Sequence, residues 1–121
     1  MLEGNFLKGG DCMNTKELRE FFEQERDKLR AGTAYFSGSD LYVNLKANIA
    51  VIGIQTSFGS SGHDYVYVVR KKGNKAHIET ILDVYSVRGR MFPTGISKDG
   101  TKFFYTVKDE NGFFHKKEKS I

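Results

Sequence analysis

The chain has 121 residues and a formal net charge of +4, from 19 lysines and arginines against 15 aspartates and glutamates. This length predicts one domain, and a moderately basic charge suits an acidic partner such as nucleic acid without indicating any fold. The single cysteine, Cys12, excludes a disulfide framework or a thiolate metal site built from one chain. No apolar run approaches the roughly twenty residues of a membrane span, and the composition suits a reducing cytoplasm.

Residues 1–12 are expected to be a disordered translated leader, which leaves a single domain at residues 13–121. The codons AAA GGA GGT GAT TGC ATG can encode the segment from Lys8 to Met13. They contain a strong bacterial ribosome-binding sequence at a suitable distance before a start codon, so Met13 is the predicted native start. The apolar residues before it have no periodicity that would bury them. A genuine N-terminal arm or a vector-derived segment is the alternative.

The segment from Asn14 to Ala31 predicts one helix. Asn14 or Thr15 can cap its first turn, and Gly32 stands where a C-terminal glycine belongs. A narrow apolar stripe, interrupted by Glu25, consists of Leu18, Phe21, Phe22 and Leu29. The charged remainder is typical of a solvated face, so the helix is expected to pack on the domain by one edge.

After Gly32 the hydrophobic period changes to two, which predicts strands. Short β-branched and aromatic runs, separated by glycine, asparagine and aspartate, are expected to form strands at residues 34–37, 41–45, 49–57, 64–71, 76–87, 102–108 and 113–117. Consecutive hairpins beside a single helix predict an α+β fold. In this fold the N-terminal helix packs on an antiparallel β-meander sheet.

The expected strand that begins at Ile49 is apolar on both faces. Ile49 and Val51 point one way, whereas Ala50, Ile52 and Ile54 point the other. The helix can cover one of these faces. Two covers are open for the second face: a strongly curled sheet, as in a half barrel, or a second copy of the protein in a homodimer.

The sequence contains no recognised catalytic or metal-binding motif. None of the histidines, His63, His77 and His115, has a visible orienting partner. His63 and Asp64 are adjacent and would project to opposite faces of a strand. The serine- and glycine-rich loop at residues 57–62 could form an anion-binding nest, but it lacks the lysine and the following helix of a P-loop. No catalytic residue, metal or cofactor is therefore predicted.

The last two expected strands form a hairpin whose turn, from Asp109 to Gly112, matches a type I turn followed by a glycine bulge. If Asp109 faces Phe113, one face of the hairpin carries Phe103, Tyr105, Val107, His115, Lys117 and Lys119. The other face then carries Lys102, Phe104, Thr106, Lys108, Phe114, Lys116 and Glu118. Phenylalanines among lysines resemble a surface on which single-stranded nucleic acid stacks. A core strand beside an edge strand protected by lysines is the alternative.

The predicted function is binding without catalysis: a small cytoplasmic protein that engages nucleic acid or another polyanion. Arginines next to the hairpin could clamp phosphates because a guanidinium forks onto anionic oxygens. The predicted binding residues are Arg88, Arg90, Lys102, Phe104, Lys108, Phe114, Lys116 and Lys117. The alternative is a phage- or plasmid-type accessory protein that binds and inhibits a host protein, such as a defence enzyme, because small size and surplus aromatic residues suit that class equally.

Overall fold

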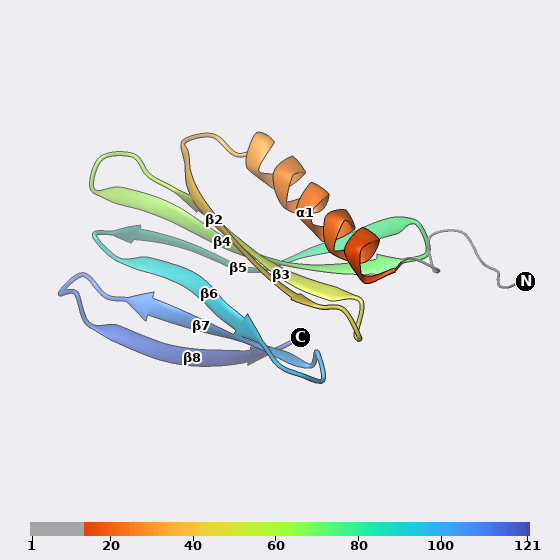
Figure 1. Cartoon of the computed structure of the whole chain (residues 1–121). Helices are drawn as coiled ribbons and strands as arrows, with labels where there is room; N and C mark the ends of the chain where they lie inside the picture. Colours follow the sequence, from red (N-terminus) through yellow and green to blue (C-terminus); the bar gives the residue numbers. More distant parts are fainter. Residues whose placement is uncertain (1–13) are drawn as a thin grey trace, which may run out of the picture.

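The computed structural model describes residues 14–121, which form one helix and seven strands. The elements are α1 (Thr15–Ala31), β2 (Phe36–Asn44), β3 (Ile49–Thr56), β4 (Ser61–Lys72), β5 (Lys75–Val87), β6 (Arg90–Ile96), β7 (Lys102–Lys108) and β8 (Phe114–Ser120). All paired strands are antiparallel, in a four-stranded sheet β2-β3-β4-β5 and a three-stranded sheet β6-β7-β8. The helix, the four-stranded sheet and the three-stranded sheet lie in successive layers (Figure 1). The predicted α+β fold with an N-terminal helix is confirmed, and the expected leader at residues 1–12 lies outside the described residues.

Helix α1 begins at the predicted cap. The Asn14 side chain accepts a hydrogen bond from the Glu17 N–H at 2.8 Å, and the Glu17 carboxylate accepts one from the Asn14 N–H at 3.2 Å. Phe22 is fully buried under the helix. Glu25 interrupts the apolar stripe and is also buried, but its carboxylate pairs with the Lys28 ammonium at 3.0 Å. The helix therefore packs by one edge, as its pattern predicts.

Strand β3 is covered on both faces by the chain itself. The residues of β3 that pack with the helix are Ala50, Ile52 and Ile54, and those that pack with the second sheet are Ile49 and Val51. Met91 of β6 and Phe103 of β7 close the second core from the opposite side. The prediction of a strongly curled sheet is therefore wrong, because the strands form two separate sheets. This face of β3 also leaves no place for a second copy of the protein.

Two expectations about the strands are corrected. Strand β6 is absent from the predicted set because its sequence contains Pro93, which has no N–H for a ladder, and Gly95. The structure accommodates both at a register shift between these two residues, where Pro93 packs against Gly53 of β3. The expected strands at 34–37 and 41–45 are one strand, β2, with an irregularity near Gly38.

Replacing Phe22 by alanine is expected to lower the free energy of unfolding by about 3 to 5 kcal/mol, because the ring is fully buried between the helix and the first sheet. The exposed residue Gln24 provides a control in the same helix, and Gln24→Ala is expected to change stability by no more than about 0.5 kcal/mol. Chemical denaturation of both variants measures the difference. A Phe22→Ala variant as stable as the wild type would contradict this packing.

Candidate nucleic-acid interface

The terminal hairpin has the predicted register. Lys108 lies opposite Phe114, Thr106 opposite Lys116, and Phe104 opposite Glu118. Side chains on neighbouring strands that lie directly opposite each other share a face, so these six residues stand together. Both of the faces defined from the sequence are therefore confirmed by the pairing.

Asp109 fixes the turn that sets this register. Its carboxylate accepts hydrogen bonds from the N–H groups of Asn111 at 2.9 Å and Phe113 at 3.0 Å, and it pairs with His115 Nε2 at 2.8 Å. The His115 contact, followed by the Phe113 N–H, holds the pKa of Asp109 below its ordinary value. Gly112 donates to the Asp109 carbonyl at 3.0 Å and has a φ of +89°, which suits the predicted glycine bulge.

The two faces of the β6–β8 sheet have different environments. Phe103 on the inner face is fully buried against the first sheet. On the outer face, Phe92 of β6 lies opposite Thr106, and Phe114 of β8 is 64% exposed. Figure 1 shows no further layer of the described chain on that side. No described element therefore covers the outer face, although Thr106 at its centre is buried by its neighbours and Phe92 and Phe104 are half-buried.

A shallow hollow of about 440 Å³ lies on this open face. It is lined by Thr94, Phe104, Tyr105, Thr106, Lys116, Lys117 and Glu118. Lys116 and Lys117 make no ion pair within the described residues. Lys117 lies opposite Tyr105, so it belongs to the other face of β8 although it contributes to the lining of the hollow. The Lys108 ammonium lies 6.0 Å from the centre of the Phe114 ring. The hollow thus combines aromatic surface with cationic groups that lack a carboxylate partner.

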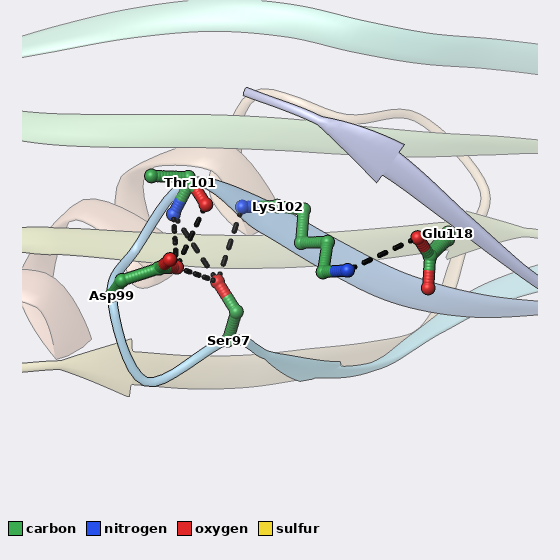
Figure 2. A network of polar contacts seen from close by, with 5 residues as sticks. All are labelled: Ser97, Asp99, Thr101, Lys102 and Glu118. Carbon is green, nitrogen blue, oxygen red and sulfur yellow. Dashed lines mark hydrogen bonds and ion pairs between the residues drawn. The ribbon is translucent and has the colours of Figure 1, made fainter.

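Lys102 differs from the other lysines because it is already paired. Its ammonium lies 3.2 Å from the Glu118 carboxylate of the neighbouring strand, as Figure 2 shows. Its backbone N–H donates to Ser97 Oγ at 3.1 Å. An exposed ion pair of this kind contributes little to stability, but the Glu118 carboxylate neutralises the positive charge of Lys102 on the outer face.

The turn between β6 and β7 is ordered by a compact network of polar side chains (Figure 2). Asp99 Oδ1 accepts from Thr101 Oγ1 at 2.7 Å, from Ser97 Oγ at 2.8 Å and from the Thr101 N–H at 3.1 Å. The hydroxyls of Thr101 and then Ser97 lower the pKa of Asp99 from 3.8 to about 2. Asn44 of β2 donates to the carbonyls of Ser97 and Lys98 at 2.9 and 2.8 Å, which attaches this turn to the first sheet.

The two predicted arginines lie at the start of β6 or just before it, and Arg90 is opposite Lys108 of β7. Arg88 is exposed in the turn between β5 and β6, with a φ of +67°. Arg90 turns toward the β3–β4 hairpin, where its guanidinium donates to Ser57 Oγ at 3.0 Å. A side chain at Gly62 would overlap that guanidinium, so the glycine makes room for it. Arg90 is thus next to Lys108 in the ladder while its guanidinium is engaged with Ser57, and the binding role of both arginines stays a prediction.

The loop at residues 57–62 is a tight hairpin turn. Phe58 and Ser61 exchange backbone hydrogen bonds at 2.9 and 3.3 Å, and the Ser57 N–H donates to the Tyr35 carbonyl at 3.0 Å. Gly59 has a φ of +66°, which glycine adopts without strain. The N–H groups of Ser57, Phe58 and Ser61 are therefore already bonded to backbone carbonyls, which leaves fewer of them for the anion nest considered from the sequence.

The expectation that no histidine has an orienting partner is wrong for two of them. His63 pairs with Asp83, which lies on the neighbouring strand β5, and His115 pairs with Asp109. The predicted divergence of His63 and Asp64 is correct: Asp64 is buried between the sheets, where its Oδ2 accepts from the Met91 N–H at 2.9 Å. Burial raises the pKa of Asp64, with the Met91 N–H acting in the opposite direction.

Comparison of the chain with protein-family models, with curated proteins and with solved structures found no match. Within residues 14–121, no group of three or more histidine, cysteine, aspartate or glutamate side chains is placed to hold a metal ion. In the same part of the chain, no helix has the length and apolar character needed to cross a membrane.

Replacing Asp99 by asparagine is expected to weaken the dependence of stability on acid. The pKa of Asp99 is about 2 in the folded protein and 3.8 as an ordinary value, so the folded state binds fewer protons between these values. Its contribution is therefore present above about pH 4 and is lost as the pH falls through about 2. Urea denaturation at several pH values in this window measures the difference between wild type and Asp99→Asn.

Lys98→Ala is the control for this measurement, because it alters the same exposed turn without removing a carboxylate. Its stability difference from the wild type is expected to stay constant across the window. A wild-type advantage over Asp99→Asn that does not shrink toward pH 2 would show that the network does not stabilise the ionised carboxylate.

Proposed function

We propose that this protein is a non-catalytic binding protein that engages single-stranded nucleic acid on the outer face of the β6–β8 sheet. One observation carries the proposal: the hairpin register gathers Phe104, Phe114, Lys108 and Lys116 on a sheet face that no described element covers. Rings on an open sheet accept stacked bases, and nearby lysines attract the phosphates between them.

The arrangement of the rings suits a single strand. Phe92, Phe104 and Phe114 come from three adjacent strands, so they form a platform across the sheet. Every base has a face that can stack on such a ring, which makes this kind of binding tolerant of sequence. Helix α1 lies beyond the other sheet and does not contribute to this platform (Figure 1), so a helix entering a duplex groove is not part of the proposal.

The charge of the face predicts moderate, salt-dependent binding. Lys108 and Lys116 are available for phosphates, whereas Lys102 is paired with Glu118. Each phosphate that a lysine neutralises releases condensed counterions, so affinity falls as salt rises. We place this activity in the cytoplasm, in keeping with a chain that has one cysteine.

Phe114→Ala is expected to weaken binding of a single-stranded oligonucleotide by about 1 to 3 kcal/mol, because it removes an exposed stacking ring. The free energy of unfolding is expected to change by less than about 0.5 kcal/mol. Phe113→Ala is the matched control, since Phe113 is 67% exposed beside Phe114 but precedes β8 and lies opposite Asp109 at the turn. Fluorescence anisotropy at low salt measures the affinities.

Lys116→Ala is expected to reduce the steepness of the plot of log binding constant against log salt concentration by about 0.7 for a single strand. The reduction is expected to be the same for all nucleotide sequences. Lys119→Ala is the control, because Lys119 lies opposite Phe103 and points to the other face. Equal effects of the two lysine changes would place the site elsewhere. If the wild-type protein binds no oligonucleotide at low salt, the nucleic-acid proposal is wrong. The alternative function, an accessory protein that inhibits a host protein, then takes its place.

A further inference from the structure

We infer that strand β5 pairs along its free edge with β5 of a second copy of the chain, which gives a two-fold dimer with one continuous sheet. Strand β5 stands last in the order of the first sheet, so β4 is its only neighbour within the described chain. An unpaired edge presents a row of backbone N–H and C=O groups that can take another strand. This inference does not depend on the nucleic-acid proposal, because β5 contributes no residue to the outer face of the β6–β8 sheet.

The four edge strands of the two sheets differ in their protection against such pairing. Strand β2 is irregular near Gly38, β6 contains Pro93, and β8 carries three lysines within seven residues. Irregularities, prolines and lysines are common protection for an edge strand. Strand β5 is 13 residues long, contains no proline, and has its one lysine, Lys75, at its first residue. It therefore lacks the features that protect β6 and β8.

Strand β5 also exposes apolar side chains on one side of the sheet. Ile78 is 46% exposed, Tyr85 63% and Val87 49%. All three lie on the side that carries helix α1. The helix packs mainly on β2 and β3, which are separated from β5 by β4. It therefore leaves this side of β5 uncovered and leaves space for a second copy beside it.

One extra residue in β5 determines the side on which each of its side chains lies. Thr80 lies opposite Tyr67 of β4 and Leu82 lies opposite Val66, so Ile81 has no partner between them. Ile81 and Leu82 both pack into the core between the two sheets. Even-numbered residues of β5 therefore lie on the helix side before this irregularity, and odd-numbered residues lie there after it.

This change in alternation limits how two copies of β5 can pair. A two-fold axis makes the two strands antiparallel, and residues directly opposite each other must lie on the same side of the sheet. Only one register meets this condition along the whole strand, with Ile81 opposite Leu82 of the second copy. The same register places the exposed Ile78 opposite the exposed Tyr85 of the second copy.

The remaining contacts in this register are also compatible. Ala76 lies opposite Val87 of the second copy, which extends the apolar contact between Ile78 and Tyr85. Thr80 lies opposite Asp83, whose carboxylate is half-exposed and can accept a hydrogen bond from the Thr80 hydroxyl. No acidic residue lies directly opposite another acidic residue, and the two-fold axis makes each contact occur twice.

A second copy suits this edge better than a foreign strand or a nucleic acid. A regular foreign strand would match the sides of β5 before Ile81 or after it, but not both. A second copy has the same irregularity at the same residue, so both strands change alternation together. The carboxylates of Glu79 and Asp83 would repel the phosphates of a nucleic acid.

Disulfide cross-linking of the full chain tests the register. Cys12→Ser removes the native thiol, and Ile78→Cys is combined with Tyr85→Cys so that the two introduced thiols lie opposite each other in the dimer. Mild oxidation is expected to link most of the protein into dimers, because residues opposite each other on paired strands have the Cα separation that a disulfide needs. Non-reducing electrophoresis measures the yield.

The two single-cysteine variants are the matched controls. Positions 78 and 85 of one strand are about 23 Å apart, since a strand rises about 3.3 Å per residue. In the inferred register the two copies of position 78 are separated by about the same distance, and so are the two copies of position 85. Neither Ile78→Cys alone nor Tyr85→Cys alone is therefore expected to cross-link more than random collision allows.

Sedimentation velocity of the unmodified protein measures the oligomeric state directly, and a dimer is expected at micromolar concentration. Ile78→Asp is expected to weaken dimerisation at least tenfold, because the new carboxylate would lie diagonally across from Asp83 of the second copy. Phe113→Asp, which changes an exposed ring at the terminal hairpin, is expected to leave dimerisation unchanged. An unchanged circular dichroism spectrum verifies the fold of each variant.

Several results would overturn the inference. They are a wild-type monomer at every concentration up to the millimolar range, a dimer that Ile78→Asp does not weaken, or equal cross-linking of the single and double cysteine variants. Efficient cross-linking of Tyr85→Cys alone would place the two-fold axis at Tyr85 and contradict the register.

Discussion

A central strand that is apolar on both faces requires two covers, and this requirement organises the whole protein. In β3 the run from Ile49 to Ile54 is buried on each side. Helix α1 covers one face of its sheet, and the β6–β8 sheet covers the other. Each cover is itself one layer thick, so the outer face of the second sheet stays open, and the helix is too short to close the first sheet to its end.

The junction of the two sheets depends on polar groups that lie between them. Asp64 is fully buried and holds the Met91 N–H at the start of β6, while Arg90 reaches back to Ser57 beside Gly62. A buried carboxylate is costly unless it is hydrogen-bonded, so these contacts favour one position of β6 over others. The position of β6 then sets that of β7 and β8, and with it the direction in which the open face of the hairpin points.

The open surface of the second sheet lies on the outer layer of the fold, on the side away from helix α1 (Figure 1). It carries phenylalanines with lysines such as Lys108 and Lys116. Rings combined with cationic groups suit a polyanion better than an apolar partner.

Local sequence patterns were sufficient to predict the helix, its Asn14 cap, a strand β3 that is apolar on both faces, and the register of the terminal hairpin. Each of these follows from residues close together in the sequence, through capping, period-two alternation or a turn that fixes cross-strand partners. Only the tertiary structure decided which layer covers the second face of β3, where Arg90 points and that His63 meets Asp83. Those features depend on pairings between segments 20 or more residues apart in the sequence. The burial of Pro93 depends on such long-range pairings as well, because local propensity disfavours a strand at that residue.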